Sequence, residues 1–208
     1  MLIAMDMLFD GDANAERTFL FAHGAGGAMD TPFMSKVARA IAAKGIRVGR
    51  FEFPYMAARR EGKRKGAPDR EPVLLASWRE AIAQAGGADS VAIGGKSLGG
   101  RMASMIAGEQ RVRALLCFGY PFHPPGQPDR LRTKHLQTLS TPSLILQGER
   151  DPFGTRDDVA GYSLSPAIRI EWMTDGDHSF KPRAASGVTL ETNLERAIEL
   201  AAAFLRAH

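Results

Sequence analysis

The chain has 208 residues, with 27 lysines and arginines, 23 aspartates and glutamates, and a single cysteine. Hydrophobic residues make up 44% and charged residues 24% of the sequence, which excludes a disordered chain, a collagen-like repeat and a disulfide scaffold. No apolar stretch approaches the ~18–20 residues that a membrane span needs, and the first six residues do not resemble a signal peptide. We therefore expect one domain over residues 1–208, with no membrane partner and, by default, a cytoplasmic location.

The net charge of +4 arises in one short segment, residues 59–66 (RREGKRKG), which carries five basic residues and one acidic residue. Such a cluster is typical of nucleic-acid binding, but no aromatic residues alternate with the charges to stack on bases. Two glycines in the segment and Pro68 after it favour a solvated loop. We therefore expect a loop and no nucleic-acid partner, while steering of an anionic substrate by these charges stays open.

Strand-like and helix-like segments alternate along the chain. Short apolar runs predict strands at residues 18–22, 46–53, 90–93, 112–119, 143–147 and 168–173. Apolar residues at helical spacing predict helices that include residues 32–45, 74–86, 102–106 and 190–205. The first dozen residues are a candidate antiparallel edge strand. This alternation predicts an α/β fold, with a mostly parallel sheet and helices on both faces.

A candidate nucleophile lies where the strand at 90–93 runs into a helix. Residues 95–99 (GKSLG) match the G-x-S-x-G pattern, in which a serine on a tight strand-to-helix turn projects its hydroxyl above the sheet. The small flanking residues permit the sharp turn, and the N-terminus of the helix favours a developing oxyanion. Glycine-rich turns of this kind also occur for packing alone. We interpret Ser97 as the nucleophile.

An activated serine needs a base, and the base needs an acid that orients it. Among five histidines, His178 lies in the loop after the strand at 168–173, and Asp151 lies just beyond the strand at 143–147. The carboxyl ends of parallel strands are where such sheets place functional groups. Asp151 also suits a plain turn, so Glu149, Asp175 and Asp177 remain alternative acids. The order Ser97, Asp151, His178 is the order expected of one fold in particular.

An oxyanion hole is the remaining part of the site. Residues 23–27 (HGAGG) follow the strand at 18–22, and glycines there let backbone N–H groups approach a substrate carbonyl oxygen. We assign one donor to Ala25, with Gly26 as the next choice, and the other to the N–H of Leu98. Gly24 belongs to the same pocket, whereas His23 is favoured as a structural residue that bonds the loop.

The segments HGAGG, GKSLGG, GERDPFG and DGDHSF, in this order, resemble an α/β-hydrolase over nearly the whole chain. Within that superfamily the chain is most similar to small, lidless bacterial proteins related to dienelactone hydrolases. It also resembles the hydrolase-like domain in a subunit of the eukaryotic non-specific-lethal chromatin complex. The resemblance implies that Ser97 is the nucleophile, His178 the general base and then acid, and Asp151 the orienting acid. It implies no cofactor.

The chain departs from that pattern in two places. Lys96 stands where many esterases carry histidine, tyrosine or a small residue, and its ammonium either lies near the nucleophile or reaches solvent. About twenty residues separate Gly119 from Ser143, too few for a large lid domain. Tyr120, Phe122 and His123 lie in this connection, either as one wall of the pocket or as a proline-stiffened crossover. Without a lid we expect a shallow, wet pocket for a small or polar ester.

Two other functions compete with a serine hydrolase. GKS at residues 95–97 resembles the end of a phosphate-binding loop, but residue 90 is not the required glycine and residues 91–94 read as strand. A catalytically idle protein of the same fold, acting as a scaffold or binding partner, is the stronger alternative. A metal site has no support, because there is no cysteine pair and no H-E-x-x-H segment.

Overall fold

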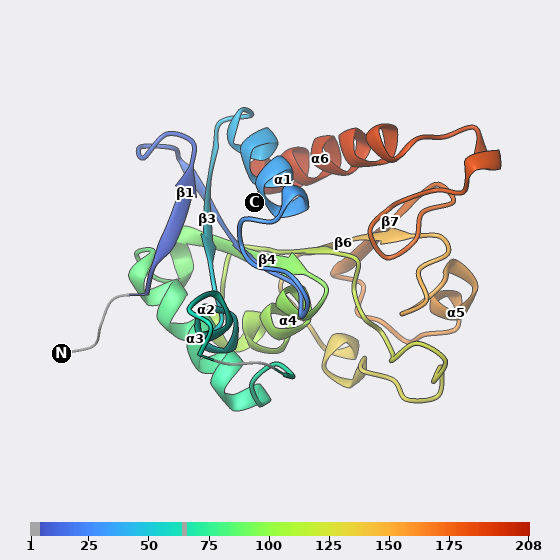
Figure 1. The fold of residues 1–208 in the computed structure, drawn as a ribbon, viewed down its shortest axis with the longest axis horizontal. Helices are drawn as coiled ribbons and strands as arrows, with labels where there is room; N and C mark the ends of the chain where they lie inside the picture. The colour runs from blue at the N-terminus through green and yellow to red at the C-terminus, as the bar shows by residue number, and fades with distance from the viewer. Residues whose placement is uncertain (1–4, 64–65) are drawn as a thin grey trace.

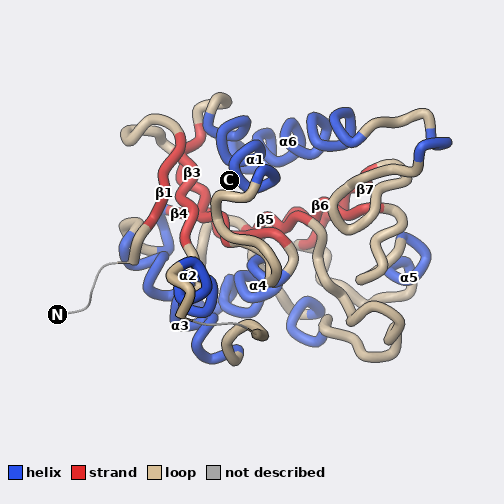
Figure 2. The backbone as a smooth tube through the Cα atoms, viewed as in Figure 1, coloured by secondary structure: helices blue, strands red, loops and turns tan. Residues whose placement is uncertain are grey.

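A computed structural model of the chain describes residues 5–63 and 66–208. Its centre is a seven-stranded sheet with the order β1-β3-β2-β4-β5-β6-β7 (Figures 1 and 2). Every pair of neighbours is parallel except β1 and β3, which are antiparallel. The strands are β1 (Met7–Asp10), β2 (Arg17–Ala22), β3 (Ile46–Phe51), β4 (Val91–Lys96), β5 (Leu115–Phe118), β6 (Ser143–Gly148) and β7 (Ile168–Met173).

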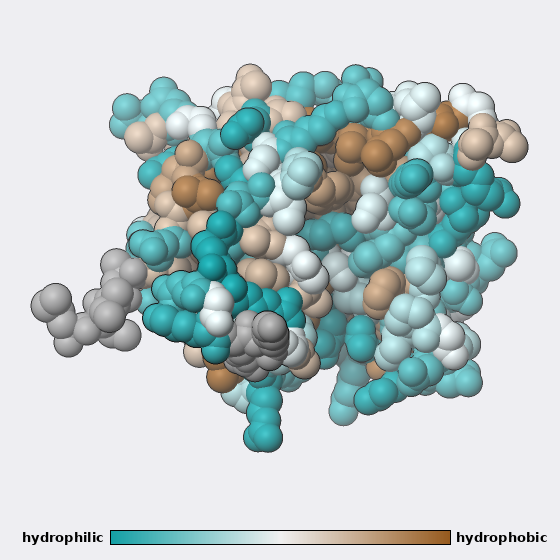
Figure 3. Space-filling view, in the orientation of Figure 1, coloured by the Kyte–Doolittle hydropathy of each residue, from teal (hydrophilic) through white to brown (hydrophobic). Residues whose placement is uncertain are grey.

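Helices cover both faces of this sheet (Figure 2). One face packs against α1 (Pro32–Ala42) and α6 (Leu190–Ala207). The other packs against α2 (Pro54–Arg60), α3 (Glu71–Gln84), α4 (Leu98–Gln110) and α5 (Arg156–Ala160). Side chains of β2 alternate between the two cores, with Phe19 and Phe21 in the first and Leu20 and Ala22 in the second, as the period of two along a strand requires. The face in Figure 3 is largely hydrophilic, with hydrophobic residues gathered beside α1 and α6.

Local sequence accounts for the longer helices. Thr31 caps α1 by accepting from the N–H of Met34, and Pro32 occupies its first turn, a position where proline loses no helical hydrogen bond. Val37 and Ile41 then lie buried on one side. Each predicted strand and each predicted helix is present, and β1 confirms the edge strand within residues 7–10.

Two short helices differ from the sequence expectation. α2 includes Arg59 and Arg60, so the predicted loop over residues 59–66 begins as helix. α5 has five residues and starts with a capping box at Thr155. Helices of five to seven residues are too short for a hydrophobic period to appear, so the spacing of apolar residues did not predict them.

The connection from β5 to β6 contains one short 3₁₀ helix, Lys134–Gln137, and no additional domain. The parallel strands place all their carboxyl ends at one edge of the sheet. The loops that follow β2, β4, β6 and β7 therefore meet there, and these loops carry the predicted functional residues.

Candidate active site

Ser97 occupies a single-residue turn between β4 and α4. Its backbone has φ of 49° and ψ of −111°, which is a strained conformation for a residue with a side chain. Its N–H donates to the Phe118 carbonyl at 3.1 Å, and its carbonyl accepts from the N–H of Arg101 at 2.9 Å. The turn is therefore held by the sheet on one side and by the first turn of the helix on the other.

Glycines on both sides of Ser97 allow the helix to start so close to the sheet. A Cβ on Gly95 or Gly99 would lie 2.5 Å from the carbonyl oxygen of Ala22 in β2. Real Cβ atoms do not approach a backbone oxygen so closely, and rigid backbone cannot yield to them. The G-x-S-x-G spacing is thus a steric requirement of this turn.

His178 and Asp151 are brought together from the loops after β7 and β6. Their Nδ1 and Oδ2 atoms lie 2.7 Å apart, and Asp151 is fully buried. Asp151 also accepts from Gln147 Nε2 at 3.0 Å and from the Phe153 N–H at 2.9 Å. Because a carboxylate accepts, the ring proton of His178 lies on Nδ1 and leaves the Nε2 lone pair free.

The alternative acids have other partners. Glu149 accepts from Arg156 at 2.9 Å and from the N–H of Asp175 at 2.8 Å. Asp175 bonds to Arg183, and its pKa is lowered to about 2 by those hydrogen bonds. Asp177 accepts from backbone N–H groups two and four residues further along its loop. The geometry therefore favours Asp151 as the partner of His178.

The environment of His178 favours its neutral form. Burial lowers the pKa of the imidazole, and the nearby positive charge of Lys96 lowers it further, while the hydrogen bond to Asp151 acts in the opposite direction. The Phe153 ring lies against the imidazole, with 4.3 Å between ring centroids. A neutral imidazole with a free Nε2 is the form that accepts a proton.

His23 is fully buried under the loop after β2, with both ring nitrogens bonded. Its Nε2 accepts from the N–H of Phe53 at 3.1 Å, and its Nδ1 therefore donates to the Gly24 carbonyl at 2.7 Å. Burial lowers the pKa of this ring. His23 is a neutral residue that holds the loop, in agreement with the interpretation favoured by the sequence.

Tyr55, in the first turn of α2, holds the same loop from below. Its hydroxyl donates to the carbonyls of Gly24 at 3.3 Å and Ala25 at 3.1 Å, and burial raises its pKa to about 12, so the proton stays in place. In a trans peptide the C=O and the following N–H point in opposite directions. The N–H groups of Ala25 and Gly26 are therefore directed away from Tyr55.

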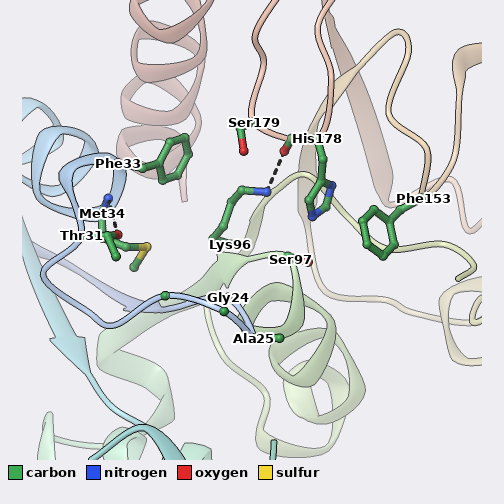
Figure 4. Close-up of a pocket in the computed structure, with 12 residues that line it drawn as sticks. Gly24, Ala25, Thr31, Phe33, Met34, Lys96, Ser97, Phe153, His178 and Ser179 are labelled. Atoms are coloured by element: carbon green, nitrogen blue, oxygen red, sulfur yellow. Dashed lines mark hydrogen bonds between the residues drawn. The ribbon is translucent and has the colours of Figure 1, made fainter. Parts of the chain in front are cut away.

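These loops surround a cavity of about 320 Å³ (Figure 4). In the close-up, the imidazole of His178 points down toward Ser97, with the Phe153 ring on its far side. The cavity is lined by Gly24, Ala25, Gly26, Gly27, Thr31, Phe33, Met34, Lys96, Ser97, Phe153, His178 and Ser179. The same cavity is therefore lined by the predicted nucleophile, the predicted base and the predicted oxyanion loop.

Of the two roles left open for Tyr120, Phe122 and His123, the pocket wall is wrong for this cavity. Tyr120 and Phe122 are fully buried and His123 is 3% exposed, and none of them lines the cavity. The backbone of Tyr120 bonds on both sides to the Gln147 amide, which turns this segment into the core beneath the site. Phe33, Met34 and Phe153 form the apolar walls instead.

Gln147 and Tyr55 were missed by the sequence analysis. Gln147 is a fully buried amide that directly follows three apolar residues of β6, and a polar residue next to such a run was the available signal. Tyr55 follows Pro54 in a segment with no recognisable pattern. Its role depends on a contact across 30 residues, which no local pattern encodes.

Lys96 lies inside the site and does not extend into solvent. The residue lines the cavity, and its Nζ donates to the backbone carbonyl of His178 at 2.7 Å (Figure 4). Burial lowers the pKa of its ammonium to about 8, against the opposing influence of Asp151 and Asp177. Of the two positions left open by the sequence, the one near the nucleophile is therefore correct.

The basic segment is partly neutralised within the chain. Arg60 bonds to Asp30 and to Glu52, at 2.9 and 2.6 Å, and Lys63 pairs with Glu61 at 2.7 Å. Arg64 and Lys65 lie outside the described residues. These ion pairs reduce the charge available to a polyanion, and the absence of a nucleic-acid partner stays a prediction.

In residues 5–63 and 66–208, no three His, Cys, Asp or Glu side chains are grouped so that they hold a metal ion. No helix among the same residues combines the length and the apolar character needed to cross a membrane.

Comparison with solved structures identifies the same fold in many chains. A dienelactone hydrolase from Anabaena variabilis is 20% identical, with a TM-score of 0.71, over 95% of this chain and 89% of the other. An alpha-beta serine hydrolase homologue from Coxiella burnetii is 19% identical, with a TM-score of 0.65, over 97% and 90%. Est1E from Butyrivibrio proteoclasticus, solved with ferulic acid bound, is 15% identical, with a TM-score of 0.70, over 97% and 96%.

The sequence itself matches a family model described as "Alpha/beta hydrolase domain" over residues 15–206. The match spans the whole of the sheet from β2 to β7 and both helical layers. The resemblance to the non-specific-lethal complex subunit stays a prediction. The predicted superfamily is confirmed, and the chain belongs to the alpha/beta hydrolase domain family.

Proposed function

We propose that this protein is a serine hydrolase of the carboxylesterase type, acting as a single domain on a small or polar ester. Ser97 is the nucleophile, His178 the general base and acid, and Asp151 the group that orients His178. One observation carries the proposal: His178 Nδ1 bonds to buried Asp151 at 2.7 Å, and its ring faces the cavity that Ser97 lines. This is the arrangement that activates a serine hydroxyl.

The proposed reaction has two steps. The Nε2 atom of His178 takes the proton of the Ser97 hydroxyl while Oγ bonds to the ester carbonyl carbon. The tetrahedral intermediate then expels the alcohol, which receives the proton from His178, and an acyl-enzyme remains. In the second step His178 takes a proton from a water, which attacks the acyl carbon. The intermediate then releases the acid, and His178 returns the proton to Oγ of Ser97.

Backbone N–H groups stabilise the oxyanion in both steps. Leu98 is the first residue of α4, so its N–H has no acceptor within the helix and lies at the positive end of the helix dipole. The Ala25 N–H is the second donor, oriented by the bonds of Tyr55 and His23 to the neighbouring carbonyls. Loss of one such donor typically costs about 3–4 kcal/mol in the transition state.

The size of the cavity supports a small substrate. Its volume of about 320 Å³ lies at the lower end of the range for ligand pockets. Phe33, Met34 and Phe153 supply apolar surface for a short acyl or alcohol group, and among the described residues no lid encloses a longer chain.

Active-site labelling tests the proposal. A fluorophosphonate is incubated with wild type and with Ser97→Ala, and the modified peptide is mapped. We expect stoichiometric labelling at Ser97, no labelling of the variant, and loss of nearly all esterase activity with an unchanged melting temperature. Labelling elsewhere, or turnover near wild type in the variant, contradicts the assignment. A folded protein that is inert to the probe and to activated esters favours the alternative, an idle scaffold of the same fold.

A further inference from the structure

Lys96 links two elements whose relative positions must stay fixed for the proposed reaction. It is the last residue of β4, directly before Ser97, and its Nζ donates to the carbonyl of His178 at 2.7 Å. The contact joins residues 82 positions apart in the sequence. The nucleophile turn and the backbone of the histidine loop are therefore connected by one side chain.

The neighbouring strand leaves space for this contact. Gly119, just after β5, has φ of 67°, and a Cβ there would lie 2.8 Å from both the Lys96 Nζ and the His178 carbonyl oxygen. The same Cβ would lie 3.2 Å from Cε1 of the imidazole. A side chain at position 119 would thus displace the lysine, the loop or the ring, and glycine is the residue that avoids this.

The ammonium is placed where burial is costly, because charged groups are poorly solvated inside a protein. The groups that face it are Asp151 from the loop after β6, Asp177 and His178 from the loop after β7, and the Phe33 ring of α1 at 5.9 Å. Asp151 and Asp177 are negative and favour the cation. These two carboxylates therefore favour the charged form of Lys96 beside the imidazole of His178.

We propose that Lys96 is a positioning residue, which ties the backbone of His178 to the end of the nucleophile strand. The inference rests on the proposed function of the site. The hydrogen bond from Lys96 fixes the carbonyl of His178 and, with it, the direction of the imidazole. The imidazole also packs on the Phe153 ring. Its positive charge opposes the protonation of the ring and so keeps the base available.

The first test measures the histidine itself and needs no catalysis. His178 is titrated by NMR in wild type, in Lys96→Met and in the matched control Lys44→Met, whose lysine pairs with Glu199 on the surface. Removal of the nearby cation raises the midpoint of His178 by about one pH unit, whereas the control leaves it unchanged. An unchanged midpoint in Lys96→Met overturns the proposal.

A chemical rescue separates positioning from a packing defect. Lys96→Cys is treated with 2-bromoethylamine, which alkylates the thiolate with loss of bromide and forms a thioether analogue of lysine. The native Cys117 is fully buried and its thiol pKa is raised by burial, so it does not react. We expect the midpoint of His178 and the kcat to return toward wild type after treatment. Treated wild type is the control, and absence of rescue in labelled, folded protein contradicts the proposal.

Kinetics with a neutral ester and an anionic ester of the same size then distinguish positioning from substrate binding. A misplaced base lowers kcat, approaching the ~10²-fold that a misplacement of about 1 Å costs, with little change in KM and equally for both esters. A loss confined to the anionic ester, and expressed in KM, shows that Lys96 binds substrate and overturns the proposal. Failure of Ser97 to label in wild type refutes the proposed function instead, and the titration still decides the role of Lys96.

Discussion

Burial and hydrogen-bond partners give two histidines of this protein different roles. His23 and His178 both have lowered pKa values because burial disfavours the imidazolium. His23 is bonded by backbone groups on both nitrogens, so it has no free lone pair. His178 is bonded on Nδ1 to the carboxylate of Asp151 and faces the cavity with its other nitrogen. The partner, rather than the residue type, thus decides which histidine is suited to be a base.

Asp151→Asn is expected to lower kcat by up to about 10⁴-fold, as in a comparable triad. Oδ2 accepts from Gln147 and His178 and Oδ1 accepts from the N–H of Phe153. An asparagine has one acceptor oxygen, so in either orientation its NH₂ group faces a donor. Activity on an activated ester and the melting temperature measure the effect, with Glu149→Gln as the control. A mild loss in Asp151→Asn points to Glu149 or Asp175 as the acid.

The pH dependence of kcat/KM follows from the lowered pKa of His178. The pKa lies below 6.5, its value in the absence of shifts, and a general base works in its unprotonated form. The rate therefore rises as pH increases through a midpoint below 6.5 and is close to its plateau at neutral pH. Initial rates between about pH 5 and 9 measure this limb. A midpoint above 6.5 contradicts the assignment of His178 as the base.

At the scale of elements, the unit β4–Ser97–α4 shows how packing fixes a strained turn. Gly95 and Gly99 bring the start of α4 against the end of β2, and the surrounding hydrogen bonds keep Ser97 at positive φ. Such strain persists only where the neighbouring structure enforces it. The α2 helix contributes at the same scale, because its first turn carries Tyr55 to the oxyanion loop.

A pair of glycine variants in α4 tests this packing. Gly99→Ala places a Cβ 2.5 Å from the Ala22 carbonyl oxygen and 2.7 Å from that of His23. We expect a loss of about 1–3 kcal/mol in the free energy of unfolding, together with reduced fluorophosphonate labelling. Gly108→Ala in the same helix meets only a Leu139 methyl at 3.8 Å, so it gains about 0.5–1 kcal/mol from helix propensity. Urea unfolding of both variants measures the contrast, and equal stabilities would refute the steric role of Gly99.

At the scale of the molecule, the site is assembled from four loops at one edge of a parallel sheet. Ala25, Ser97, Asp151 and His178 follow β2, β4, β6 and β7, so distant segments meet because their strands run in one direction. The helical layers cover the faces of the sheet (Figure 1), and the loops at this edge line the cavity (Figure 4). Specificity therefore depends on the loops, and the walls come from α1 and from the turn after β6.

The small cavity, and the lack of a lid in the part of the chain that the structure describes, predict a preference for short acyl chains. A homologous series of nitrophenyl esters, from acetate upward, is expected to show the highest kcat/KM for the shortest chains, because longer chains extend beyond Phe33 and Met34 into water. Phe33→Ala enlarges one wall and shifts the optimum toward longer chains. An optimum at long chains in wild type contradicts the predicted substrate class.

The sequence by itself determined the strands, the four longer helices, the turn at Ser97 and the order Ser97, Asp151, His178. These features are local: apolar periodicity reports which face of a segment is buried, and a glycine pattern reports a tight turn. The short helices α2 and α5 were not predicted, because a hydrophobic period does not develop over five to seven residues. Only the tertiary structure decided that Tyr120, Phe122 and His123 lie in the core, that Phe33 and Phe153 form the walls, and that Lys96 bonds to the His178 loop. Those outcomes depend on contacts between segments far apart in the chain, and a contact of that kind has no periodic signature in either partner.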